Sequence, residues 1–269
     1  MFNIMSGVLA DEPGRFGPLR VVDAAGRREM DCGPACLGAS WLEPAFLVEG
    51  APVRPGPLPA ANYLLGWLVA AADRPDGHVL MAGLGSGAGP IALAAAFPAL
   101  RVTVAEIDPA VITLARMHFP LLGHFERQGR ITVLAEDIRD TVRRGDGGPW
   151  SIACLDAFVD DEALDCPPDL LDGLHGLADD LWLNILDWED YTATRRYGEL
   201  LEDRGWRPAW RMPIHDGDDD AMAGNVLLGT RKLHRGRLRH LAPFLHLPHP
   251  RTDRLHRDLQ TIIARMLPW

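Results

Sequence analysis

Apolar residues recur along most of the chain in short runs that alternate with amphipathic stretches. From Ala60 onward the apolar runs suit buried strands, and the stretches between them have the spacing of helices. The predicted strands are residues 78–82, 101–106, 131–135, 151–156 and 181–186, and the predicted helices include 60–73, 90–97 and one opened by Asp108 and Pro109. Such alternation favours a parallel sheet with helices on both faces.

The pattern changes after these elements. Residues 207–213 and 224–230 have the pattern of two successive strands, joined by the acidic turn 215–220. A closing antiparallel pair on an otherwise parallel sheet is typical of class I methyltransferase-like folds and less so of NAD-binding ones. We therefore predict an α/β protein with a Rossmann-like class I methyltransferase fold, in which seven strands form one mostly parallel sheet.

The N-terminal part has a different pattern. Residues 19–30 predict a β-hairpin around an Asp-Ala-Ala-Gly turn, and two short strands are predicted near 37–41 and 45–49. The proline-rich segment 51–59 cannot lie inside a helix and marks a boundary. The predicted division is a small β unit with its linker at 1–59, a Rossmann-like domain at 60–232, and a basic helical tail at 233–269. A basic landing patch for an acidic partner is the alternative for the tail.

Composition narrows the function classes. The chain has 269 residues with 47% hydrophobic and 24% charged residues, which is enough to bury a large core. Its formal net charge of -10 argues against binding to nucleic acid or to an anionic membrane, because phosphate groups attract a basic surface. The uncharged stretch 78–100 holds glycines and prolines that would break a spanning helix. The first residues lack a basic and apolar signal segment, so we expect a cytoplasmic protein.

The four cysteines do not form a disulfide framework of the density that a small secreted fold needs. Cys32 and Cys36 have metal-ligand spacing, but no second pair follows, and the tail histidines lack the partners of a zinc site. We expect free thiols and no metal.

A glycine-rich loop follows the strand 78–82. It consists of Gly83, Leu84, Gly85, Ser86 and Gly87. Glycines let the backbone turn sharply and approach a ligand without a Cβ between them. Dehydrogenases share this pattern, so the loop alone predicts a nucleotide-type ligand without naming it.

Acids at the ends of the next two strands make the prediction more specific. Glu106 lies 23 positions after the first loop glycine, a separation that suits a carboxylate accepting both ribose hydroxyls. Asp137 can accept from an adenine amino group, with Ile107 and Ile138 as the apolar neighbours of the ring. Asp137 is explained equally well as the N-cap of a helix at 138–144.

A further group of acids follows the strand 151–156. Asp156 ends that strand at the ligand face of the sheet, and Asp160 and Asp161 lie on the loop beyond it. Such a carboxylate group can hold an amine nucleophile and take its proton during attack on a sulfonium carbon. A solvated acidic loop is the alternative for Asp160 and Asp161.

Together these motifs resemble the spermidine synthase family. The resemblance is carried by VTVAEIDPAVITLARMHF, EDIRD, LDAF with PPDLL, WLNIL and NVLLGTR, and it covers roughly residues 18–231. It implies an N-terminal β unit on a Rossmann-like domain, a thioether-nucleoside ligand and a dimer. It also implies that Glu106 holds the ribose, Asp137 the adenine and Asp156 the attacking amine.

The chain departs from that family at the residues that choose the reaction. Aminopropyltransferases carry an aspartate in the glycine loop, GGGDGG, which binds the aminopropyl ammonium of decarboxylated S-adenosylmethionine; Ser86 stands in its place here. The DSSDPxGP gate is replaced by DAFVDD. Tyr63 keeps the family's tyrosine, but Leu64 and Leu65 follow it instead of the Gln/Glu pair.

The hypothesis that follows is methyl transfer from intact S-adenosylmethionine to a small amine or hydroxyl acceptor, which the acidic lining suggests is cationic. The predicted catalytic residues are Asp156, Asp160 and Tyr63. Aminopropyl transfer from decarboxylated S-adenosylmethionine and aminocarboxypropyl transfer are alternative reactions. An NAD-dependent oxidoreductase would not explain Asp137, and a catalytically silent nucleoside-binding protein also fits. We expect a homodimer.

Overall fold

The computed structural model describes most of the chain. The described residues are 7–43, 45–145, 147–156, 158–159, 162–163, 167–187, 190–214, 224–233, 259–261, 263–264 and 266–269. The predicted acidic turn 215–220, the aspartates Asp160 and Asp161, Cys166 and most of the predicted tail lie outside the described residues.

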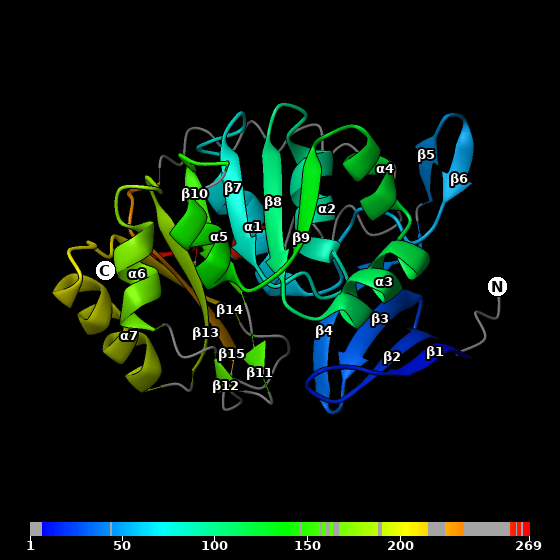
Figure 1. Cartoon of the computed structure of the whole chain (residues 1–269), viewed down its shortest axis with the longest axis horizontal. Coiled ribbons are helices and arrows are strands. Elements are labelled where there is room, and N and C mark those ends of the chain that lie inside the picture. Colours follow the sequence, from blue (N-terminus) through cyan, green and yellow to red (C-terminus); the bar gives the residue numbers. More distant parts are fainter. Residues whose placement is uncertain are drawn as a thin grey trace.

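A mostly parallel sheet forms the centre of the main domain (Figure 1). Its strands run in the order β16-β14-β15-β13-β10-β7-β8-β9. Their bounds are β7 (His78–Ala82), β8 (Arg101–Glu106), β9 (Ile131–Ala135), β10 (Ile152–Leu155), β13 (Leu181–Asp187), β14 (Trp210–Ile214), β15 (Gly224–Gly229) and β16 (Leu267–Pro268). The strands from β13 to β9 pair in parallel, and β15 lies antiparallel between β13 and β14. The predicted class I methyltransferase-like fold is confirmed.

The sheet has eight described strands where seven were predicted. The added strand, β16, pairs antiparallel with β14 at the edge of the sheet. Leu267 and Pro268 are too few to show a period of two in the sequence, which is why the pattern did not predict them. The end of the predicted tail is therefore attached to the main sheet, and a Cβ on Gly198 of α7 would lie 2.1 Å from the Trp269 ring.

Helices cover both faces of this sheet. Their bounds are α1 (Asn62–Ala71), α2 (Ala88–Ala96), α3 (Pro109–His118), α4 (Leu121–Arg127), α5 (Ile138–Arg144), α6 (Pro168–Leu174) and α7 (Thr192–Asp203). One buried cluster joins α1 to α4 with alternate strand residues such as Val79 and Met81, and a second joins α5 to α7 with Leu80 and Ala82. Successive residues of β7 thus face opposite layers, as the strand period of two requires.

A separate antiparallel sheet forms the N-terminal unit, with strands in the order β1-β2-β3-β4. The strands are β1 (Gly7–Pro13), β2 (Pro18–Ala24), β3 (Arg27–Cys32) and β4 (Ala35–Trp41). The predicted hairpin at 19–30 is confirmed, and Ala25 and Gly26 make its turn with positive φ. The edge strand β1 was not predicted, because its residues are exposed on both sides and carry no alternating apolar pattern.

Two small hairpins lie outside these two sheets. They are β5 (Phe46–Val48) with β6 (Ala51–Val53), and β11 (Phe158–Val159) with β12 (Glu162–Ala163). The hairpin of β5 and β6 extends into the proline-rich segment. Proline lacks an amide hydrogen and is tolerated in an edge strand, and Pro52 lies in β6, which is paired only with β5 among the described residues. Within the described residues, no helix is both long and apolar enough to cross a lipid bilayer.

Candidate functional site

A cavity of about 550 Å³ lies where the parallel strands end. Strand β7 has β8, the next strand in the chain, on one side and β10 on the other. The strand order therefore reverses at β7, and open α/β sheets bind their ligands at such a switch point. The wall opposite the sheet comes from the N-terminal unit. The lining residues used below are Arg15, Phe16, Leu37, Gly38, Tyr63, Gly83, Gly85, Ser86, Glu106, Ile107, Asp108, Val111, Asp137, Ile138, Arg139, Asp156, Asn184 and Asn225.

The glycine loop packs tightly under strand β4. A Cβ placed on Gly85, whose φ is +52°, would lie 2.0 Å from the carbonyl oxygen of Leu37. A side chain is therefore excluded at this position by space as well as by backbone conformation. Gly83 and Gly85 line the cavity as predicted, but Gly87 does not line it among the described residues. Gly87 is the N-cap of α2 with φ +80°, so its positive φ serves the start of the helix.

Ser86 is fully buried. Its Oγ accepts a hydrogen bond from the Ala88 amide at 3.3 Å, and a Cβ on Gly38 of β4 would lie 2.5 Å from that oxygen. Strand β4 therefore closes over the position at which the resemblance places an aspartate. A larger, charged side chain there would require β4 to move.

Glu106 ends β8 and is 7% exposed. Its Oε2 accepts from the amide of Leu84 at 2.8 Å, and its Oε1 accepts from the amide of Asp108 at 2.8 Å. Burial raises the pKa of Glu106, and these amide hydrogen bonds oppose the rise. Each carboxylate oxygen can accept a second hydrogen bond. Glu106 thus fixes the glycine loop and keeps acceptor capacity at the cavity, as ribose binding requires.

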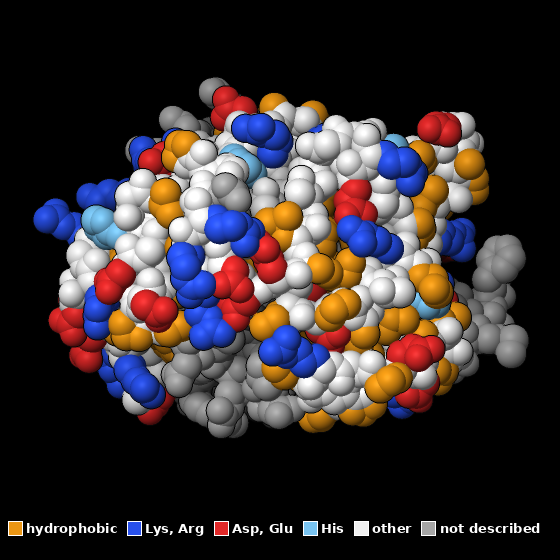
Figure 2. Space-filling view, in the orientation of Figure 1, with side chains coloured by type: hydrophobic (Ala, Val, Ile, Leu, Met, Phe, Trp, Pro, Cys, Tyr) orange, Lys and Arg blue, Asp and Glu red, His pale blue; other side chains and the backbone are white. Residues whose placement is uncertain are grey.

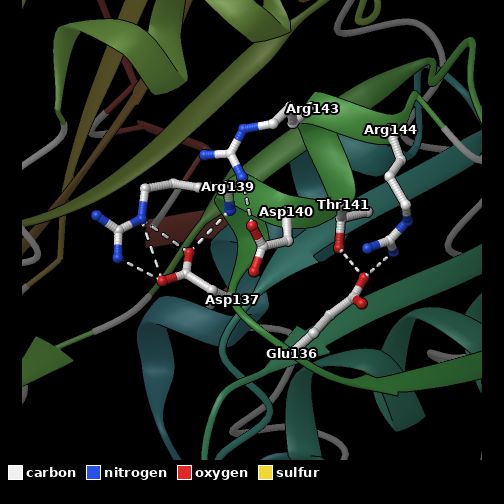
Figure 3. Close-up of polar contacts among 7 residues, drawn as sticks. All are labelled: Glu136, Asp137, Arg139, Asp140, Thr141, Arg143 and Arg144. Carbon is white, nitrogen blue, oxygen red and sulfur yellow. Dashed lines mark hydrogen bonds and ion pairs between the residues drawn. The ribbon is translucent and has the colours of Figure 1, made fainter.

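Asp137 is the N-cap of α5. Its Oδ1 accepts from the amide of Arg139 at 2.9 Å, and the Arg139 side chain pairs with both carboxylate oxygens (Figure 3). The Arg139 side chain holds the pKa of Asp137 below its ordinary value. The N-cap interpretation is confirmed. Asp137 also lines the cavity, so its contact with an adenine stays a prediction.

Further ion pairs brace the same helix start (Figure 3). Glu136 accepts from the hydroxyl of Thr141 at 2.6 Å and from the guanidinium of Arg144, which keeps the pKa of Glu136 low. Asp140 pairs with Arg143 at 2.6 Å. On the face of the molecule shown in Figure 2, acidic and basic side chains are intermingled around this helix. Since all these acids have cationic partners, the acids around α5 do not form a strongly negative surface.

Asp156 follows β10 at the opposite side of the glycine loop. The Asn184 side chain donates to its Oδ1 at 2.8 Å. Burial raises the pKa of Asp156 from 3.8 to about 6, while the hydrogen bond from the Asn184 side chain acts against that rise. A carboxyl group with this pKa can exchange a proton near neutral pH.

The structure brings most of the predicted site residues into one cavity. Tyr63, in the first turn of α1, lines it together with Asp156, Glu106, Ile107 and Ile138. Asp160 lies outside the described residues. The sequence reasoning did not predict several residues that line the cavity, among them Arg15, Phe16, Leu37, Gly38, Arg139, Asn184 and Asn225. Asn184 could have been predicted from the sequence, because it is a polar residue within the apolar run of strand β13.

Among the described residues, Cys32, Cys36 and Cys154 form no disulfide. Cys36, together with Glu29 and Asp31, places possible ligand atoms within 4.8 Å of one another. Cys36 is exposed at the protein surface. Glu29 already pairs with Arg27 at 2.6 Å. This group gives no support to a metal site.

Solved structures share the fold. A probable spermidine synthase from Corynebacterium glutamicum matches with a TM-score of 0.66 and 13% identity over 94% of both chains. Spermidine synthase from Thermotoga maritima matches with a TM-score of 0.60 and 10% identity, covering 94% of this chain and 87% of that one. Human methyltransferase-like protein 13, solved in complex with SAH, matches with a TM-score of 0.52 and 17% identity, covering 75% of this chain and 93% of that one.

The chain has the spermidine synthase-like, class I methyltransferase fold. No protein-family model and no curated protein sequence matches it. The match with the first two structures spans nearly the whole chain. At these low identities the likeness establishes the architecture, and the chemistry has to be argued from the residues of the cavity.

Proposed function

We propose that this protein binds S-adenosylmethionine and transfers its methyl group to a small amine or hydroxyl acceptor. The observation that carries the proposal is the pairing of two carboxylates across the glycine loop. Glu106 keeps acceptor capacity at one side of the loop, and Asp156, whose pKa is about 6, lies at the other. The first suits a ribose and the second suits a nucleophile that must lose a proton.

The residues divide the ligand between them. Glu106 would accept from the ribose hydroxyls, and Asp137 and the apolar side chains of Ile107 and Ile138 would hold the adenine. The donor brings a methyl carbon that its sulfonium already activates. The protein's task is then to hold acceptor and donor in line and to keep water away.

Asp156 and Asn184 would hold the acceptor. The buried Asn184 Oδ1 lacks a hydrogen-bond partner within the described part of the chain, while its Nδ2 is used by Asp156. An unpaired buried carbonyl oxygen costs free energy until a donor reaches it. An acceptor molecule with N–H or O–H groups could donate to both Asn184 and Asp156. As it attacks, Asp156 would take the proton that it loses.

Aminopropyl transfer from decarboxylated S-adenosylmethionine is the second candidate. It is favoured by the match to the spermidine synthases, which extends over the N-terminal sheet as well as the main domain. The buried Ser86 counts against it, because no carboxylate stands there to bind the aminopropyl ammonium and Gly38 leaves no room for one. Aminocarboxypropyl transfer from the intact donor uses the same residues and shares its donor preference with methyl transfer.

Calorimetric titration with both donors separates these reactions. We expect S-adenosylmethionine and S-adenosylhomocysteine to bind more tightly than decarboxylated S-adenosylmethionine and methylthioadenosine. The reverse order would replace methyl transfer by aminopropyl transfer. Binding of NADH in place of all four ligands would refute the transferase proposal as a whole. Product analysis with S-adenosylmethionine and an amine library then distinguishes methylated from aminocarboxypropylated acceptors by mass.

A further inference from the structure

The loop between β1 and β2 covers one end of the cavity. It consists of residues 14–17, and the amide of Gly14 closes it by donating to the carbonyl oxygen of Gly17 at 3.0 Å. Arg15 and Phe16, at its tip, both line the cavity. The N-terminal sheet therefore contributes a loop as well as strand β4 to the wall that faces the ligand.

Hydrogen bonds fasten this loop to the carboxylate proposed to hold the ribose. The amide of Arg15 donates to Oδ2 of Asp108 at 2.6 Å, and Asp108 is only 4% exposed. The amide of Asp108 in turn donates to Glu106 at 2.8 Å. Since Glu106 also holds the glycine loop, the tip of the β1–β2 loop has a fixed position at the nucleoside end of the cavity.

Phe16 is unusual among the aromatic residues of the described structure. It is 42% exposed and lies outside the two buried clusters, although it lines the cavity. The apolar side chains of Ile107, Val111 and Ile138 line that cavity as well. The Arg15 guanidinium lies 5.6 Å from the Phe16 ring centroid, which limits where the ring can go. An aromatic face left open at a cavity gains most when a flat ring covers it.

We propose that Phe16 stacks on the purine ring of the bound nucleoside through the ring face opposite the Arg15 guanidinium. This inference rests on the proposed function, because it assumes a purine-nucleoside thioether as ligand. It assigns part of the nucleoside site to the N-terminal sheet. Asp108 holds this loop in place, since its side chain accepts the hydrogen bond from the Arg15 amide.

The test is calorimetry on Phe16→Ala with S-adenosylhomocysteine and with adenosine. Loss of a base–aromatic stack weakens binding by about tenfold, and the factor is the same for both ligands because they share the purine. Phe16→Tyr retains the ring and restores the affinity. Val8→Ala is the matched control, because Val8 is 53% exposed on β1 and does not line the cavity. Thermal unfolding of each variant reports whether the fold is kept.

The outcomes are distinguishable. Equal weakening of both ligands in Phe16→Ala, with recovery in Phe16→Tyr, supports the stack. Unchanged affinity in Phe16→Ala while the wild type binds overturns the inference and leaves the proposed function standing. Failure of the wild-type protein to bind either ligand overturns both. If only Phe16→Ala unfolds, the affinities of Phe16→Leu decide, because leucine keeps the apolar bulk and removes the ring; an unchanged affinity there contradicts stacking.

Discussion

Burial raises the pKa of the Asp156 carboxyl to about 6. Neutral pH lies about one unit above this pKa, so the carboxyl is mostly ionised in the folded protein. The folded protein therefore keeps a charge in a place that disfavours it. In the unfolded chain the same carboxyl ionises near 3.8. Between these two values the folded state binds more protons than the unfolded state, so the free energy of unfolding falls as the pH rises from about 4 to 6 and is level above it. Asp180, whose pKa is also raised to about 6, acts in the same direction.

Asp156→Asn isolates the contribution of Asp156 from that of Asp180. The variant removes the half-buried charge, so we expect it to be more stable than the wild type by about 1–3 kcal/mol at pH 7.5 and equally stable near pH 3.5. Urea unfolding across this pH range measures the difference. Asp172→Asn, which removes an exposed carboxylate paired with Arg204, is the control and should change little.

The same variant tests the chemistry. Asparagine cannot take a proton, so turnover should fall by about 10²-fold or more while the affinity for S-adenosylhomocysteine stays within a few-fold. Single-turnover assays and calorimetry on the same preparation give both quantities. A variant that is more stable and fully active would contradict the catalytic role of Asp156 but would still agree with its raised pKa.

The positions of the candidate site residues were predictable where a strand end carries an acid. Glu106 and Asp156 fall at the ends of strands whose apolar runs define them, so their meeting at one edge follows from a parallel sheet. Asn184 and Phe16 were not predicted. Their importance depends on which of their atoms remain unpaired or uncovered, and that is decided by tertiary contacts absent from the local sequence.

At the scale of elements, strand β4 and the glycine loop behave as one unit. The carbonyl of Leu37 occupies the space next to Gly85, and Gly38 allows contact with Ser86. The glycine pattern predicted the turn after β7 and its place at the cavity. It could not predict that a strand from another sheet would press on it, because β4 lies more than forty positions earlier in the chain.

Gly85→Ala tests that unit. The new methyl group meets a backbone carbonyl and an unfavourable positive φ, so we expect a loss of about 3 kcal/mol or more in unfolding free energy, or displacement of β4 with loss of donor binding. Gly129→Ala is a matched control: its φ is +68°, but a Cβ there has open space. The control should lose only about 1–2 kcal/mol. Equal stabilities for the two variants in urea unfolding would show that the contact with β4 does not matter.

The elements themselves followed the sequence closely in the main domain. Strands β7, β8 and β9 and helix α5 have the predicted bounds, because apolar runs and an N-cap aspartate mark them. The exposed strand β1 and the short β16 did not follow from the sequence. Both are stabilised by pairing with a neighbouring strand and carry too little pattern of their own.

At the scale of the whole molecule, the dimer stays a prediction from the family resemblance. We expect light scattering after gel filtration to give about twice the chain mass of 29.5 kDa. A mass that stays at one chain across a hundredfold range of concentration would contradict it. The site described above uses residues of one chain, so a monomer would leave the proposed function in place.

The central claim is that this cavity binds an S-adenosyl thioether nucleoside through Glu106. Titration of S-adenosylhomocysteine into the wild type and Glu106→Gln tests it most directly, with Glu126→Gln, an exchange at the Glu126–Arg116 ion pair, as the control. We expect binding by the wild type and the control, and a loss of about 10²-fold or more in Glu106→Gln, because an amide cannot accept from both hydroxyls and both backbone amides. Equal affinity in all three proteins, or none in the wild type, would contradict the account.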